Sequence, residues 1–251
     1  MDLGLRDRVY LVTGGSRGLG YAAAQALVAE GARVVVSGRD GGAAAAAAQA
    51  LGAGQAVGAG QAVGLAADNA DPATPGRLIA AARGQFGRLD GALISVGGPP
   101  PGAATDVPDE AWEAAFGSVF LGAARLSRAL AAELPDGGAI AFVLSSSVRV
   151  PIPGLAISNG LRPGLAGFAK TLAAELGPRG IRVNGLLPGW IATDRLRELG
   201  PAREELAGSI PLRRVGEPAE FGRAAAFMLS PAASYLTGTM LPVDGGALRA
   251  I

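Results

Sequence analysis

The feature that most constrains this chain is residues 9–20, where an apolar run passes through a glycine-rich turn into a helical pattern. The Val- and Leu-rich run predicts a buried strand, and the Ala-rich segment 21–30 predicts a helix. The first N–H groups of a helix lack internal partners, and the helix dipole favours negative charge there. Gly14, Gly18 and Gly20, spaced G-x-x-x-G-x-G, exceed what an ordinary tight turn needs and let the backbone approach a ligand closely. The stretch therefore predicts a pyrophosphate site.

Composition excludes several kinds of site. The chain has neither Cys nor His, which excludes disulfides and thiolate chemistry and removes the usual general base and the commonest metal ligand, so we expect no metal. A net charge of +1 gives no electrostatic argument for a nucleic-acid or membrane partner. Segment 1–8 is polar, and no apolar run reaches the roughly 18 residues of a membrane span. A cytoplasmic protein is expected.

Apolar runs alternate with helical patterns along the chain. Strands are expected near 9–12, 33–37, 63–67, 89–96, 138–144, 181–187 and 239–243, and helices near 21–30, 43–51, 72–86, 109–134, 158–176, 192–205 and 217–229. This alternation predicts an α/β fold, a doubly wound parallel sheet (Rossmann fold) of about seven strands with helices on both faces. No linker divides the chain, so a single domain over 1–251 is expected. A tandem copy, 53–58 and 59–64, is interpreted as a duplicated loop before the third strand.

Several motifs, which lie mostly where predicted strands end, resemble those of the short-chain dehydrogenases/reductases. Segment 13–20 is similar to the family's TGxxxGxG turn. Segment 180–184, with Pro188, Gly189 and Thr193, is similar to its nicotinamide-side segment, and segments 236–238 and 243–246 are similar to its C-terminal signature. The match runs through nearly the whole chain and is most similar to the 3-oxoacyl-acyl-carrier-protein reductase branch. The resemblance implies a nicotinamide dinucleotide held by Gly14, Ser16, Arg17, Gly18, Leu19, Gly20, Arg39, Asp68, Asn69, Gly97, Pro188, Gly189, Ile191 and Thr193.

The end of the second predicted strand indicates which dinucleotide binds. NAD-binding proteins place an acid there to hold the ribose 2′-hydroxyl. Here the position is Gly38, followed by Arg39, and Arg17 lies in the glycine turn. Two guanidinium groups suit a 2′-phosphate, which favours NADP(H) over NAD(H). In the alternative, Arg39 is solvated and Asp40 holds the ribose.

The catalytic positions implied by the resemblance depart from the family pattern of Asn, Ser, Tyr and Lys. The Tyr position falls on Ser158, the Lys position on Arg162 and the Asn position on Val119. The serine position falls on Ser145, with Ser146 nearly equivalent. The only lysine, Lys170, lies two helical turns beyond Arg162, and none of the three tyrosines stands at the family's position.

Reduction of a ketone needs a hydride and a proton, and a serine hydroxyl is a much weaker acid than a phenol. Arg162 suits electrostatic stabilisation of an oxyanion but not proton relay. Two functions follow: an NADP(H)-dependent oxidoreductase acting on a small carbonyl or alcohol with an altered site, or a non-catalytic NADP(H)-binding protein. The resemblance also implies a homodimer or homotetramer that packs through the helices near 109–134 and 158–176.

Overall fold

A computed structural model describes residues 2–53, 60–199 and 203–249. Its centre is one sheet of seven strands in the order β3-β2-β1-β4-β5-β6-β7, and every pairing is parallel. The strands are β1 (Val9–Val12), β2 (Arg33–Gly38), β3 (Ala62–Ala66), β4 (Gly91–Ser95), β5 (Ala139–Val143), β6 (Arg182–Pro188) and β7 (Met240–Val243). The strand order reverses between β1 and β4, which is the switch point at which such sheets bind ligands. The predicted doubly wound fold is confirmed.

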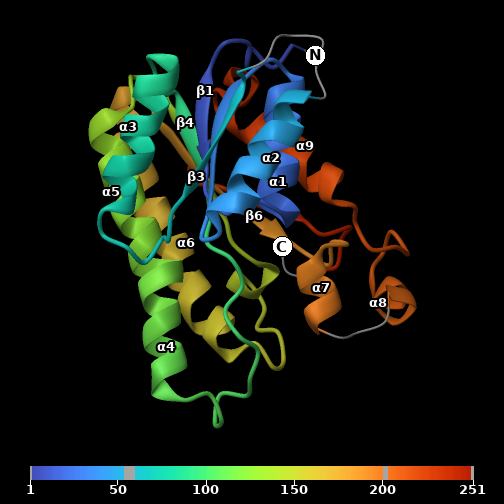
Figure 1. The fold of residues 1–251 in the computed structure, drawn as a ribbon. Helices are drawn as coiled ribbons and strands as arrows, with labels where there is room; N and C mark the ends of the chain where they lie inside the picture. Colours follow the sequence, from blue (N-terminus) through green and yellow to red (C-terminus); the bar gives the residue numbers. More distant parts are fainter. Residues whose placement is uncertain (1, 54–59, 200–202, 250–251) are drawn as a thin grey trace.

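Helices cover both faces of the sheet (Figure 1). One face carries α1 (Gly18–Ala29), α2 (Gly41–Ala53) and α9 (Pro218–Leu229), and the other carries α3 (Thr74–Phe86), α5 (Gly122–Glu133) and α6 (Ala156–Leu176). Side chains alternate between the faces as a strand requires, so Tyr10 packs on the α9 side and Leu11 on the α6 side. Two short helices, α7 (Asp194–Leu199) and α8 (Arg203–Ser209), stand apart from both layers.

The long helix expected over 109–134 is interrupted. It comprises α4 (Asp109–Ala115), a π-helical stretch η1 (Phe116–Leu121) and then α5. Gly122 opens α5 against the backbone of Asn69, where a Cβ would overlap the Asn69 carbonyl oxygen. The apolar pattern hides this change because π and α turns bury the same kind of side chain, and Val119 is buried within η1.

Three further details differ from the expectation. The helix expected near 158–176 begins earlier, at Ala156, and Pro163 lies inside it. The second copy of the tandem repeat enters β3 through residues 62–64, while 54–59 lie outside the described residues. The single helix expected over 192–205 is α7 and α8, on either side of undescribed residues 200–202.

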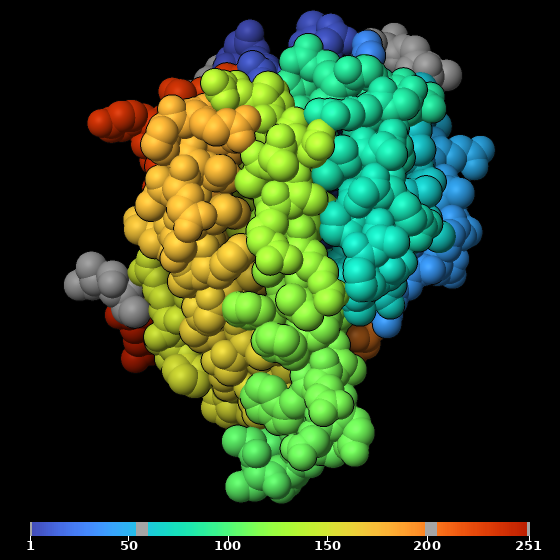
Figure 2. Space-filling model, turned by 90° about the vertical axis from the view of Figure 1, so that its left-hand side faces the viewer, coloured from blue at the N-terminus to red at the C-terminus, as the bar shows by residue number. Residues whose placement is uncertain are grey.

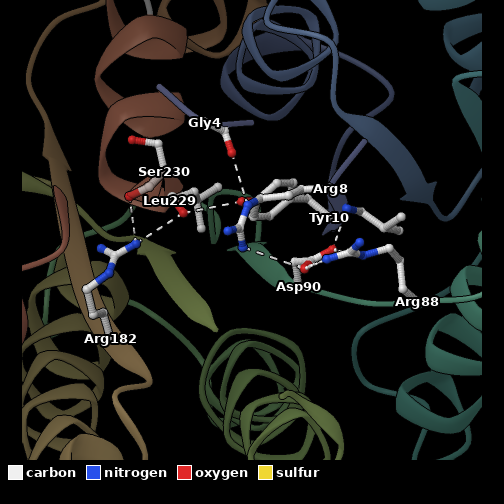
Figure 3. Close-up of polar contacts among 9 residues, drawn as sticks. Gly4, Arg8, Tyr10, Arg88, Asp90, Arg182, Leu229 and Ser230 are labelled. Atoms are coloured by element: carbon white, nitrogen blue, oxygen red, sulfur yellow. Dashed lines mark hydrogen bonds and ion pairs between the residues drawn. The ribbon is translucent and has the colours of Figure 1, made fainter. Parts of the chain in front are cut away.

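The amino-terminal ends of the strands are held together by charged side chains (Figure 3). The Asp90 carboxylate, 2% exposed, accepts hydrogen bonds from Arg88 Nε at 2.8 Å, from Arg88 Nη2 at 2.6 Å and from the Val9 N–H at 2.8 Å. Arg8 Nη1 lies 3.6 Å from the same carboxylate. On β6, Arg182 donates to the carbonyls of Met228, Leu229 and Ser230, and its side chain thereby caps the carboxyl end of α9. This edge is therefore fixed, and it lies opposite the edge where ligands bind.

Replacing Asp90 with alanine should lower the free energy of unfolding by about 3 kcal/mol, measured by urea denaturation. The buried Val9 N–H loses its acceptor, whereas Arg8 and Arg88 are partly exposed and regain water. Asp90→Asn keeps an acceptor for Val9 but loses the charge, so roughly half of that loss is expected. Equal losses in the two variants would show that the Val9 hydrogen bond contributes nothing measurable.

Among the described residues, no helix combines the length and the hydropathy that crossing a bilayer demands.

Candidate active site

The glycine turn between β1 and α1 has the conformation that a diphosphate site needs. Gly14 and Gly18 both have φ of +58°, a region that side chains disfavour. A Cβ at position 20 would overlap the carbonyl oxygen of Gly14. Arg17 is the N-cap of α1, but its side chain makes no capping hydrogen bond, and the first turn contains no acidic residue. The N–H groups that open α1 are therefore left for an outside anion, and the residues present fit a dinucleotide phosphate.

Hydrogen bonds join this turn to the end of β4, and join the end of β4 to the loop that follows β3. The Thr13 hydroxyl donates to the Ser95 carbonyl at 2.8 Å and accepts from the Ser95 N–H at 2.9 Å. The Asn69 side-chain amide donates to the same carbonyl at 3.3 Å. Asp68 is exposed, and its Oδ1 accepts the Ala70 N–H at 2.9 Å. The structure thus brings Asn69 and Asp68 to the carboxyl edge beside the glycine turn.

An acidic side chain at position 38, at the end of β2, would displace the Ser16 hydroxyl. A Cβ on Gly38 would lie 2.8 Å from the Ser16 hydroxyl oxygen. Arg39 is exposed, and Asp40 Oδ1 accepts the Ala43 N–H at 3.0 Å, as an N-cap of α2 does. Asp40 is therefore engaged in holding its own helix, while the Arg39 guanidinium faces solvent.

The segment that follows β6 returns to the glycine turn. The Gly189 N–H donates to the Val243 carbonyl at 3.1 Å, and a Cβ on Gly189 would meet Asp244 at 2.6 Å. Ile191 is buried, whereas Pro188 and Thr193 are half-buried. The Thr193 methyl carbon lies 3.8 Å from where a Gly18 Cβ would stand. Two predicted parts of the dinucleotide site, distant in the sequence, are thus neighbours.

The serine run after β5 pairs with α6 in a way that the sequence did not indicate. Ser145 Oγ accepts the Ser147 N–H at 3.1 Å and so caps a short 3₁₀ turn, η2 (Ser146–Val148). The Ser147 and Ser158 hydroxyls are both buried and lie 3.2 Å apart. The two predicted serines, Ser145 and Ser146, are half-buried. Nothing in a run of three serines shows which one turns toward α6, because the 3₁₀ turn decides it.

The guanidinium of Arg162 holds the ends of two strands. Its Nη1 donates to the Val143 and Leu144 carbonyls, both at 2.9 Å, and its Nη2 donates to the Gly97 carbonyl at 2.6 Å. The residue is 7% exposed. Burial, with a smaller contribution from Arg195, lowers the Arg162 pKa to about 10, so the side chain stays charged at neutral pH. Arg162 therefore brings a permanent positive charge to the site.

Arg195 on α7 is a second cation of the site, and it was not among the predicted residues. Its Nη2 donates to the Pro99 carbonyl at 2.6 Å, and its Nη1 lies 3.5 Å from Glu198 Oε2. The other Glu198 oxygen lies 4.0 Å from Arg17 Nη1. Nothing in the sequence marks Arg195, because its place depends on how α7 folds back over the loop after β4.

The tyrosines and the lysine lie elsewhere. Tyr10 is fully buried on the α9 side of the sheet, where burial raises its pKa to about 12. Tyr21 packs against the same core, and Tyr235 is fully exposed. Lys170 is exposed and donates to the Gly238 carbonyl at 3.1 Å. Neither Lys170 nor any of the three tyrosines therefore lies beside the Ser158 hydroxyl or the Arg162 guanidinium. Over the ranges that the structure describes, no three carboxylates gather as a metal site would need.

Comparison with known proteins places this chain in a family. A family model described as enoyl-(acyl carrier protein) reductase matches residues 14–247. The chain is 38% identical to an L-rhamnose 1-dehydrogenase (NAD(P)(+)) of Azotobacter vinelandii, an alignment that covers 96% of this chain and 97% of that protein.

Two solved structures from Brucella melitensis show the same fold. A 3-ketoacyl-(acyl-carrier-protein) reductase complexed with NADH is 32% identical with a TM-score of 0.89, over 97% of this chain and 99% of the other. A short-chain dehydrogenase/reductase described as glucose/ribitol dehydrogenase is 27% identical with a TM-score of 0.92, over the full length of both. With the glycine turn, the switch point and these matches together, the chain belongs to the short-chain dehydrogenase/reductase family of oxidoreductases.

Proposed function

We propose that this protein is an NADP(H)-dependent oxidoreductase that interconverts a small carbonyl compound and its alcohol, similar to the 3-oxoacyl reductases. The observation that carries the proposal is the glycine turn, whose positive φ angles and open N–H groups suit a dinucleotide diphosphate. The name of the Azotobacter relative gives NAD(P)(+) as its nucleotide, and the Brucella reductase was solved with NADH. These relatives therefore do not by themselves distinguish NADP(H) from NAD(H).

The end of β2 favours the phosphorylated nucleotide. Position 38 is glycine, so it offers no carboxylate to a ribose 2′-hydroxyl, and Asp40 caps α2. Arg39 and Arg17 offer exposed guanidinium groups, which bind phosphate through charge-assisted hydrogen bonds. Asp68, Asn69, Gly97, Ile191 and Thr193 would line the remainder of the dinucleotide. When bound, the nucleotide would supply the hydride.

Arg39→Gln should weaken NADPH binding by about 10–100-fold, the size expected for one charge-assisted contact to phosphate, and leave NADH binding nearly unchanged. Isothermal titration calorimetry with both nucleotides measures this difference. Arg6→Gln is the matched control, because Arg6 is exposed and precedes β1 at the opposite edge of the sheet. If Asp40→Ala weakened NADH binding instead, the ribose would rest on Asp40 and the assignment to NADP(H) would be wrong.

The reacting carbonyl would lie among side chains from β5 and α6. Ser145 and Ser146 would polarise the carbonyl oxygen, and the hydroxyl pair Ser147 and Ser158 would hold a proton near it. The positive charge of Arg162 would stabilise negative charge on that oxygen through space, without a hydrogen bond to it, since its guanidinium stays protonated. A serine is a weak acid, so slow turnover is expected, with the proton passing from water through the Ser147 and Ser158 hydroxyls.

A ketone-reduction screen on protein saturated with NADPH tests the activity. Steady NADPH oxidation with at least one ketone, lost in Ser158→Ala, is the expected result. Tight NADPH binding with no turnover across the screen would favour the second candidate, a non-catalytic NADP(H)-binding protein. The specific observation behind that candidate is the mutual hydrogen bond of Ser147 and Ser158, with neither tyrosine nor lysine beside it.

The assembly that we propose is a homodimer or homotetramer. Figure 2 shows α3, the α4–α5 segment and α6 running side by side over one broad face of the molecule. Phe116 on that segment is 45% exposed and stacks on Phe120 with ring centroids 5.4 Å apart. Light scattering should report two or four copies.

We also propose a cytoplasmic location and neither a nucleic-acid nor a membrane partner, since the net charge is only +1.

A further inference from the structure

Two guanidinium groups flank one three-residue segment of the candidate site. Arg162 reaches it from α6 and donates to the Gly97 carbonyl, and Arg195 reaches it from α7 and donates to the Pro99 carbonyl, each at 2.6 Å. Gly98 lies between them, and a Cβ there would stand 2.7 Å from Arg195 Nε. The glycine thus allows the Arg195 guanidinium to lie against the backbone beside Arg162.

The charge of Arg162 is not balanced. All three of its acceptors are neutral backbone carbonyls, and no carboxylate pairs with it among the residues that the structure describes. Arg195 is close enough to disfavour the charge on Arg162. A buried charge without a counter-ion is costly, and a second nearby cation adds to that cost. An anion bound between the two guanidinium groups would offset both of these costs.

Arg162 also keeps hydrogen-bond donors for such an anion. A guanidinium has five N–H groups, and Arg162 uses three of them. Within the described parts of the chain, its Nε–H and one Nη2–H have no acceptor. Arg88 shows what these two nitrogens bind elsewhere in the same molecule, since its Nε and Nη2 hold the two oxygens of Asp90 at 2.8 and 2.6 Å.

We infer that Arg162 and Arg195 bind a carboxylate of the substrate, so that this enzyme acts on an oxo acid rather than on a neutral ketone, ester or thioester. The inference rests on the proposed function. Arg162 would supply the fork of Nε and Nη2, and Arg195, which is more exposed, would supply a second charge. Glu198, 3.5 Å from Arg195, is the group that the substrate carboxylate would replace.

Calorimetric titration of acetoacetate and methyl acetoacetate into protein saturated with NADP⁺ tests this inference. A ketone with the oxidised nucleotide cannot react, so the heat reports binding alone. Acetoacetate should bind at least about 10-fold more tightly than its uncharged ester, the effect of one charge-assisted contact. Arg195→Gln should remove most of this preference by weakening acetoacetate alone, and Glu198→Gln should strengthen acetoacetate.

Arg197→Gln is the matched control, because Arg197 lies on the same helix, is exposed and pairs with Asp194. It should leave both affinities unchanged. Arg162→Lys keeps the charge but not the fork, and it should also lose the preference, with folding checked by its melting temperature. Equal binding of the acid and the ester would overturn the inference, as would an Arg195 variant that weakens both alike. If NADP⁺ itself failed to bind, the proposed function would fall, and the same titration of nucleotide-free protein would still decide whether the arginines hold a carboxylate.

Discussion

Gly20→Ala should abolish useful binding of NADPH, with a loss of about 100-fold or more in affinity. The added Cβ would overlap the Gly14 carbonyl oxygen, so the turn and the start of α1 must move apart. Each charge-assisted hydrogen bond that the diphosphate loses costs roughly 10–100-fold. The protein itself should lose only about 1–3 kcal/mol of stability, as is usual for overpacking. Calorimetry with NADPH and a urea melt measure the two effects separately.

Gly84→Ala is the matched control for this variant. Gly84 is exposed inside α3, and nothing lies within 4 Å of the position its Cβ would take. Alanine there should raise stability by up to about 1 kcal/mol and leave NADPH binding unchanged. Unchanged NADPH affinity in Gly20→Ala would mean that the nucleotide does not rest on the glycine turn, and the proposed function would lose its main support.

The double variant Ser158→Tyr with Arg162→Lys should raise the rate of ketone reduction by about 10²–10⁴-fold over the wild type. It restores the residue pair of the family, in which a lysine lowers the pKa of a neighbouring phenol so that it donates a proton near neutrality. The two positions lie one turn apart on α6, with Ser158 beside Ser147 at the carboxyl edge. Initial rates of NADPH oxidation with a neutral ketone measure the gain.

Ser158→Phe with Arg162→Lys separates proton donation from the shape of the ring. It places the same aromatic ring at 158 without a hydroxyl, so it should show no gain. If the phenylalanine variant were as fast as the tyrosine variant, the improvement would come from packing. A folded tyrosine variant that binds NADPH but gains no activity would show that position 158 does not face the reacting carbonyl, which would overturn the role proposed for Ser158.

Local patterns were enough to predict the architecture. The seven strands lie within a few residues of their expected places because each is a short apolar run bounded by turn residues. The π-helical stretch η1 escaped prediction because its apolar residues repeat much as those of an α-helix do. Likewise, the N-cap role of Asp40 needed the observed start of α2, since the sequence alone left Asp40 as an alternative ribose ligand.

The sequence by itself determined the sheet, its helices and the glycine turn, because these follow from residues that are neighbours along the chain. Only the tertiary structure decided which serine meets Ser158 and what Arg162 holds. The partners of Arg162 are 18, 19 and 65 residues away, and they come within reach only when β4, β5 and α6 pack together. Hydrogen bonds between distant elements depend on that packing, and no local pattern of residue types records it.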